Sequence, residues 1–174
     1  MDEAEIDLKE KNMMWLFKSH AKGFLANYPE SDLEWLTIAQ HHGLPTRLLD
    51  WTLSPLVAMF FTVSKHEDCD GAVYVWDIKK FKKESEIKLE SLDEIVAIFP
   101  SHKTKRVTAQ SGMFTVHPTN DQKLDNDDIK KIIVPQKEKK KILRKLCKYG
   151  IHSASLFPGL DGITEYIKFH NNYI

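Results

Sequence analysis

Polar side chains of several different chemistries are concentrated between positions 40 and 54, beside the almost entirely apolar run Leu56 to Phe61. A guanidinium can bind an anion through paired hydrogen bonds, a carboxylate can stabilise positive charge, and an imidazole can transfer protons near neutral pH. Solubility does not require such groups among apolar neighbours, so the segment predicts one wall of a site. Its polar members are Gln40, His41, His42, Thr46, Arg47, Asp50, Thr52 and Ser54.

Arg47 and Asp50 are the charged members of this segment, and two interpretations of them stay open. In the first, they line a pocket in which Thr46, Thr52 and Ser54 supply hydroxyls that bind further oxygens of a ligand. In the second, they form a buried structural ion pair, and Ser54 only caps the helix that follows. The residue types fit both interpretations.

His41, His42 and Gln110 complete the set of candidates. Neighbours on a helix point about 100° apart, so one of the two histidines could face a site as acid, base or hydroxyl-positioning group. The alternative is a hydrogen-bonded histidine at a helix end. Gln110 precedes a predicted turn, where its side chain could bind a ligand or tie the turn to a neighbouring strand. A metal site needs three or four ligands, and the histidines with Asp50 are too few, so no metal is expected.

The elements that position these residues begin with two helices. Ser31 and Glu34 form a capping-box pattern, in which Ser31 accepts from the Glu34 backbone and the Glu34 side chain reaches back to the cap. The second helix is expected from Asp32 to about His42, before Gly43. The first helix is amphipathic, and its apolar face is expected to contain Met13, Leu16, Phe17, His20 and Phe24.

After a short strand or extended turn at Arg47 to Asp50, the pair Ser54-Pro55 suits the start of a buried helix that runs to about Lys65. Strands are predicted at 71–76, 95–99, 113–116 and 129–134, and helices at 137–149 and about 161–170. Phe157 and Leu160 are expected in the core, with Asp161 capping the last helix. The sequence therefore predicts a single α+β domain over residues 1–174, with a small mixed or antiparallel sheet and packed helices.

The composition excludes several classes of protein. The 25 basic and 25 acidic side chains cancel, so only a local patch could bind nucleic acid. No apolar run is long enough for a membrane span, and residues 1–10 lack the layout of a secretory signal, which indicates a cytoplasmic protein. The local patch, which could meet phosphates or be an ordinary solvated helix face, consists of Lys137, Lys139, Lys140, Lys141, Arg144, Lys145 and Lys148, with Lys103, Lys105 and Arg106 as an extension.

The chain resembles the FRG domain family, a bacterial family named for a Phe-Arg-Gly motif. The resemblance rests on residues 40–52, Ser54-Pro55 and Ala58, and it continues at Arg106, at 110–114 and at 157–162. It covers roughly residues 12–168. No Phe-Arg-Gly occurs in this sequence, so the resemblance implies a domain that lacks the N-terminal portion carrying this motif.

A partial similarity to the ADP-ribosyltransferases extends this interpretation. Thr52-Leu53-Ser54 before a helix is similar to the second element of their pattern, and Gln110-Ser111-Gly112 falls where the third would be, although glycine replaces its catalytic glutamate. The similarity implies NAD as a possible cofactor, Asp50 as the carboxylate that stabilises the sugar cation, and Arg47 as a pyrophosphate clamp.

The sequence therefore predicts one of two functions. The first is a nucleotide- or NAD-linked transferase or glycohydrolase-like site, with Arg47, Asp50, His42 and Gln110 as catalytic residues and Thr46, Thr52, Ser54 and His41 as ligand-binding residues. The alternative is a non-catalytic module that binds a nucleotide, a nucleic acid or a protein partner.

Overall fold

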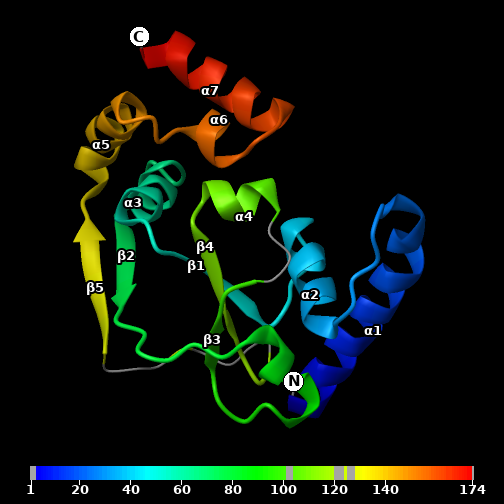
Figure 1. Ribbon diagram of the computed structural model, residues 1–174. Coiled ribbons are helices and arrows are strands. Elements are labelled where there is room, and N and C mark those ends of the chain that lie inside the picture. The colour runs from blue at the N-terminus through cyan, green and yellow to red at the C-terminus, as the bar shows by residue number, and fades with distance from the viewer. Residues whose placement is uncertain (1–2, 101–103, 120–123, 125–127, 174) are drawn as a thin grey trace. The chain divides into compact units, whose positions relative to one another are not determined.

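The computed structural model describes residues 3–100, 104–119, 124 and 128–173, and in it the chain forms two compact units, each assembled from three segments. Unit 1 contains residues 1–50, 78–102 and 113–124, and unit 2 contains residues 51–77, 103–112 and 125–174 (Figure 1). Helices and small antiparallel sheets make the fold α+β, as predicted. Because the segments of the units alternate along the chain, neither unit is a contiguous piece of sequence.

Unit 1 places two helices with a three-stranded sheet of order β1-β4-β3. In this sheet β3 and β4 are antiparallel, with Val96 opposite Val116. Their side chains form much of the unit's core together with Leu33 and Leu36, because both faces of these short strands are buried. The elements are α1 (Glu3–Ala21), η1 (Lys22–Phe24), α2 (Asp32–His41), β1 (Leu48–Thr52), η2 (Glu84–Glu86), η3 (Leu89–Ser91), β3 (Val96–Ile98) and β4 (Gly112–Val116).

The buried face of α1 differs from the predicted one. Phe17 is half-buried and packs edge-on against Trp35, but Leu16 is exposed and Phe24 is 90% exposed. The residues that α1 buries most deeply are Glu10 and Met14, one helical turn apart. Acids are rarely buried unless they are paired. A carboxylate on the buried face therefore makes this face hard to recognise from the spacing of hydrophobic residues.

The start of α2 follows its sequence signal with one change. Ser31 accepts from the backbone N–H of Glu34 at 3.1 Å, as the capping box predicts. The Glu34 carboxylate, however, accepts from the backbone N–H of Glu30 at 2.7 Å rather than from that of the cap residue. The bond from the Glu34 side chain therefore connects Glu30, the residue before the cap, to the first turn of α2.

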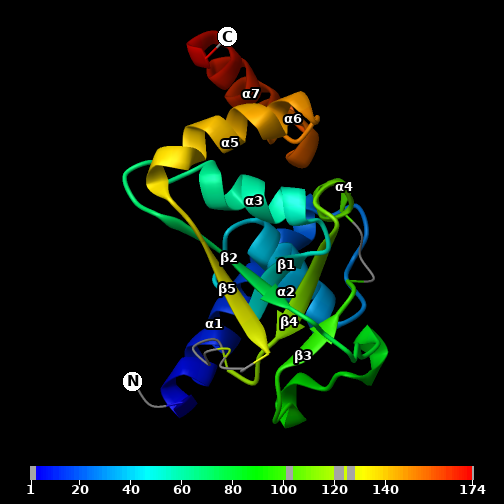
Figure 2. The same cartoon turned by 90° about the vertical axis from the view of Figure 1, so that its left-hand side faces the viewer.

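Unit 2 contains the remaining helices and a two-stranded sheet. Strands β2 and β5 are antiparallel, with Gly71 opposite Val134, and α3 and α5 lie together at one end of this ribbon (Figure 2). A Cβ at Gly71 would lie 2.9 Å from the Thr62 carbonyl oxygen, so this close approach of α3 to β2 requires glycine. The elements are α3 (Pro55–Val63), β2 (Gly71–Trp76), α4 (Lys105–Ala109), β5 (Ile129–Val134), α5 (Gln136–Lys148), α6 (Ser153–Leu156) and α7 (Leu160–Tyr173).

The core of unit 2 joins α3, β5, α5 and α6. Ser54 caps α3 by accepting from the Val57 N–H at 3.4 Å, and Pro55 is the first helical residue, as predicted. Phe157 packs against this core, but Leu160 is 82% exposed, so its prediction as a core residue was wrong. Since α7 already begins at Leu160, Asp161 lies inside its first turn instead of capping it. The buried core residues are Val57, Phe60, Val63, Val134, Leu146 and Leu156.

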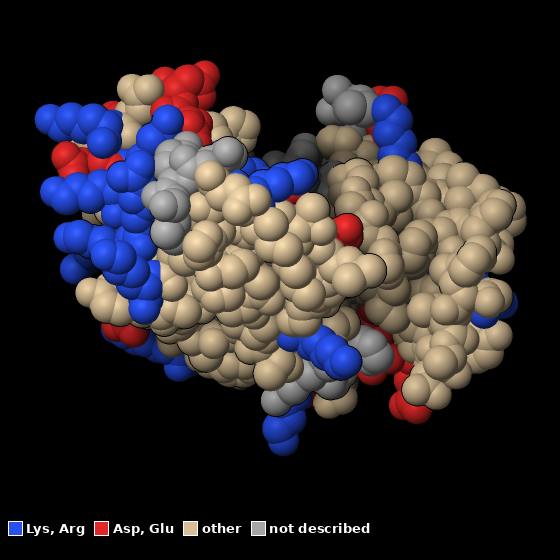
Figure 3. Space-filling model, turned by 90° about the horizontal axis from the view of Figure 1, so that it is seen from above, with Lys and Arg blue, Asp and Glu red and all other residues tan. Residues whose placement is uncertain are grey.

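Helix α5 carries the predicted basic patch, and its Lys and Arg side chains gather along one edge of the surface in Figure 3. One member was assigned wrongly. Lys139 is only 2% exposed, and its Nζ donates to the backbone carbonyls of Lys65 at 2.8 Å and His66 at 2.7 Å. The ammonium group thus satisfies carbonyls that follow α3, which explains why a lysine can occupy the buried side of α5.

Within the described part of the chain, none of the helices is both long enough and apolar enough to cross a membrane. This agrees with the sequence, in which the longest apolar run forms α3.

Candidate functional site

Arg47, the predicted anion clamp, is a buried cross-link in unit 1. Its Nε donates to Glu10 Oε2 at 2.6 Å, its Nη2 donates to Asp7 Oδ1 at 2.9 Å, and its Nη1 donates to the Pro118 carbonyl at 2.7 Å. Its backbone N–H donates to the other Glu10 oxygen at 3.0 Å. The guanidinium therefore joins α1 to the start of β1 and to the segment after β4.

The electrostatics of this cross-link follow from its carboxylates. Burial alone would lower the pKa of Arg47, but hydrogen bonds and charge from Glu10 and Asp7 outweigh it, so the pKa is raised. The pKa of Asp7 is lowered, first by its hydrogen bond from Lys11 and then by Arg47, against the opposing effect of burial. Both groups are therefore charged at neutral pH, and the positive charge of Arg47 is already compensated.

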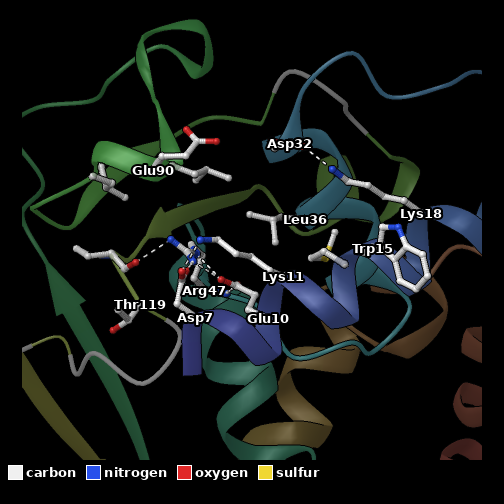
Figure 4. Close-up of a pocket in the computed structure, with 14 residues that line it drawn as sticks. Asp7, Glu10, Lys11, Trp15, Lys18, Asp32, Leu36, Arg47, Glu90 and Thr119 are labelled. Atoms are coloured by element: carbon white, nitrogen blue, oxygen red, sulfur yellow. Dashed lines mark hydrogen bonds and ion pairs between the residues drawn. The ribbon is translucent and has the colours of Figure 1, made fainter. Parts of the chain in front are cut away.

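A cavity of about 550 Å³ opens beside this cross-link, which is a size typical of small-molecule pockets. Arg47, Asp7 and Glu10 lie at one end, Trp15 lies toward the other end along α1, and Glu90 of η3 lies across from them (Figure 4). All of its lining residues belong to unit 1. They are Asp7, Glu10, Lys11, Met14, Trp15, Lys18, Asp32, Leu36, Arg47, Leu89, Glu90, Leu92, Pro118 and Thr119.

Each cation in the pocket wall is paired with an acid. Lys11 lies 2.6 Å from Asp7, and Lys18 is hydrogen-bonded to Asp32. Glu90, by contrast, is exposed and forms no ion pair with any residue that the structure describes. The pocket wall therefore offers carboxylates as hydrogen-bond acceptors to a ligand, whereas its positive charges are already paired.

The apolar part of the wall is built mainly by helices. Met14 and Leu36 are buried and line the pocket, while Trp15, which also lines it, is 68% exposed. An indole at the edge of an apolar cavity can stack on a flat ring of a ligand. The arrangement can therefore bind a ring on its apolar side and hydrogen-bond donors on its acidic side.

The other predicted residues of unit 1 lie at the end of α2 and along β1. Thr46 donates to the Gln40 side chain, and its hydroxyl oxygen accepts from the Leu48 N–H at 3.3 Å. The rings of His41 and His42 meet edge to face, and Asp50 is exposed on β1. The carboxylates that Arg47 contacts are thus those of α1, which the sequence interpretation did not include. A role of these other residues in a site stays a prediction.

The predicted residues of unit 2 meet at the turn between β1 and α3. Thr52 Oγ1 donates to the Gln110 carbonyl at 2.7 Å and accepts from the Ser54 N–H at 3.0 Å. The Gln110 side chain donates to the Leu156 carbonyl at 3.0 Å. The backbone carbonyl of Gln110 thus binds Thr52 at the end of β1, while the Gln110 side chain contacts α6. These bonds are structural, and the predicted roles of Gln110 in catalysis and of Thr52 and Ser54 in ligand binding stay predictions.

Sequence reasoning missed four residues of the pocket that carry its chemistry. Asp7, Glu10, Trp15 and Glu90 lie far from the polar segment, and each looks like an ordinary surface residue in the sequence. One signal was present for Glu10, because it precedes Met14 by four positions and Phe17 by seven, which places all three on one side of a helix. Nothing in the sequence distinguishes Glu90.

The fold and the site define an α+β protein with a pocket beside a buried arginine cross-link. The model of the FRG domain matches residues 2–71, which confirms the resemblance to the FRG domain family over this stretch. The match contains the segment 40–58, whereas the motif residues at 106, 110–114 and 157–162 lie outside it. No curated protein and no solved structure matches the chain. The similarity to ADP-ribosyltransferases gains no support from these comparisons.

Proposed function

We propose that this FRG-domain protein is a binding module whose pocket in unit 1 takes a small, flat-ringed ligand with hydrogen-bond donors, such as a nucleoside or a nicotinamide-type base. The observation that carries this proposal is the pairing of every cation in the pocket wall with a carboxylate, beside an exposed indole and Glu90, which forms no ion pair with any described residue. A carboxylate can accept from ribose hydroxyls or an amide, while Trp15 stacks on the ring.

The alternative, NAD-linked transfer or glycohydrolysis, needs a group that holds the pyrophosphate. Arg47 would have to release Glu10, whose side chain is buried, and a buried carboxylate without its cation is strongly disfavoured. A pyrophosphate would also approach the carboxylates of Asp7 and Glu90. These features favour binding of the uncharged or cationic part of a nucleotide over a catalytic phosphate clamp.

The test is titration of the intact chain with adenosine, nicotinamide, ADP-ribose and NAD, followed by calorimetry and by tryptophan fluorescence. We expect adenosine or nicotinamide to bind, and ADP-ribose to bind no more tightly than adenosine. Trp15→Ala should weaken the binding about fivefold to a hundredfold, since stacking on an aromatic residue contributes about 1–3 kcal/mol. Phe24→Ala is the matched control, because Phe24 is also an exposed aromatic residue of unit 1 and does not line the pocket.

Two results would overturn the proposal. One is the failure of all four compounds to bind. The other is tight binding or turnover of NAD that requires Arg47 and depends on its pyrophosphate, which would support the transferase interpretation. Glu90→Gln distinguishes the two interpretations further, because it should weaken nucleoside binding if the protein is the proposed binding module and strengthen pyrophosphate binding if it is a transferase.

A further inference from the structure

The solvent side of α5 carries a continuous set of cations in unit 2. They recur at steps of three and four residues, which places them along one face of the helix, opposite the buried Leu146 and Lys139. At 1.5 Å per residue this face is roughly 16 Å long. Its members, all exposed, are Lys137, Lys140, Lys141, Arg144, Lys145 and Lys148.

Much of this positive charge is not neutralised by ion pairs with the residues that the structure describes. Lys140 pairs with Glu67 at 3.1 Å, and Lys141 lies 4.0 Å from Glu138 in an exposed pair that contributes little. Lys137, Lys145 and Lys148 form no ion pair with any described residue. Since the chain as a whole has no net charge, the positive electrostatic potential at this face comes from its own lysines and arginine.

The helix that carries the cations is fixed to the body of unit 2. Lys139 reaches from its buried side to the carbonyls of Lys65, His66 and Cys69, and Leu146 packs in the core. The Gln136 N–H at its start donates to Asp70 at 2.7 Å. The cationic face is therefore held in place through the start and the buried side of the helix before any partner arrives, which reduces the entropy cost of binding.

We propose that the α5 face binds the phosphate backbone of a nucleic acid without reading its sequence. Five of its six cations are lysines, which act as point charges on phosphates, whereas base-specific contacts mainly use the planar groups of arginine, asparagine or glutamine. A face of roughly 16 Å spans about five phosphates along one strand of a duplex. Tyr149, which is 70% exposed directly after Lys148, offers a ring for an unpaired base.

A lipid surface fits the same face less well. A helix that lies in a membrane interface inserts an apolar side between the headgroups. The apolar side of α5 instead packs in the core of unit 2, through Leu146, Ile142 and Leu143. The face thus offers charge without an insertable apolar surface.

The experiment measures binding of the intact chain to labelled 20-mer duplex and single-stranded DNA and RNA by fluorescence anisotropy between 50 and 200 mM salt. If about four phosphates are neutralised, the affinity for duplex should fall about a hundredfold over this range. The triple variant Lys141→Ala, Lys145→Ala, Lys148→Ala should lose most of the binding and flatten the salt dependence. The corresponding triple arginine variant should keep both.

The matched control removes three exposed lysines of unit 1, Lys79, Lys80 and Lys88, by the same substitution to alanine. It changes the net charge equally and should leave the affinity nearly unchanged. Equal losses in both triple variants would overturn the proposal, because they would indicate a nonspecific charge effect. So would equal affinity for polyglutamate, or binding to vesicles of anionic lipid in place of nucleic acid. Thermal unfolding of each variant verifies that the helix remains folded.

Discussion

Arg47 illustrates how a residue that looks catalytic can be structural. Its position in a dense polar segment suggested an anion clamp, but its guanidinium donates to Glu10, Asp7 and a backbone carbonyl. The side chain is buried, so its charge is stable there only because the carboxylates compensate it. Its part in the pocket is to hold the acids of α1 in place.

The first prediction follows from this compensation. Arg47→Met should lower the free energy of unfolding by about 3–5 kcal/mol, because it leaves the buried Glu10 carboxylate without its cation. The double variant Arg47→Met, Glu10→Gln should be much closer to the natural protein, because no unpaired charge remains and the glutamine oxygen can still accept from the backbone N–H of residue 47. Urea unfolding followed by circular dichroism measures both. A double variant no more stable than the single one would contradict this account.

At the scale of single elements, the beginning of α6 depends on a histidine. His152 Nδ1 accepts from the Ser155 N–H at 3.2 Å, and the ring stacks on Tyr166 of α7 with centroids 4.3 Å apart. Burial lowers the pKa of His152 below its usual value of 6.5. Only the neutral imidazole can accept this hydrogen bond, so the cap of α6 belongs to the deprotonated state.

The second prediction concerns the pH dependence of this cap. Because the pKa is lower in the folded state, the unfolded chain takes up the proton first as the pH falls through about 6.5, and stability should decrease below that pH. His152→Asn should keep a cap acceptor and remove this component of the pH dependence. Hydrogen exchange of the α6 and α7 amides at pH 7.5 and 5.5 measures it. Equal protection at both pH values in the natural protein would show that His152 does not control the cap.

The helices also show where periodicity fails at this scale. The buried face of α1 was predicted wrongly because an acid, Glu10, occupies a buried position. Lys139 was predicted on the solvent side of α5 because it is charged, but it is buried as well. Both residues are charged, and both are buried against partners distant in the sequence. Hydrophobic periodicity cannot detect such positions, since it counts every charge as exposed.

At the scale of the whole molecule, the two units are interleaved along the chain. Strand β1 is next to β4 in its sheet, yet more than fifty residues separate them, and β3 pairs with β4 from a third segment. The FRG match, residues 2–71, therefore includes β1 but neither β4, beside which it lies, nor β3.

The third prediction is that a fragment of residues 1–71 does not fold by itself. It lacks β3 and β4 of the sheet and the Pro118 carbonyl that Arg47 contacts, so α1 and α2 would lose most of their core. We expect no cooperative thermal transition in circular dichroism and few dispersed amide signals in a proton–nitrogen NMR spectrum, in contrast to the full chain. A native-like, cooperative fragment would show instead that α1, α2 and β1 are sufficient.

The sequence by itself determined the local features of this protein. Strand β2 begins and ends as predicted, the caps of α2 and α3 form, and the α+β class follows, because capping and alternation act between residues near each other in the chain. The resemblance carried by residues 40–58 likewise came from sequence alone.

The tertiary structure decided what the polar residues do. It paired Arg47 with acids some 40 positions earlier, left Asp50 exposed, and used the Gln110 side chain in unit 2 to bind the Leu156 carbonyl. It also brought Trp15 and Glu90 to the lining of one pocket. The physical reason is that a buried charge is stabilised by the opposite charge that the folded chain brings into contact with it. The spacing of residues along the sequence does not show which distant residue that partner will be.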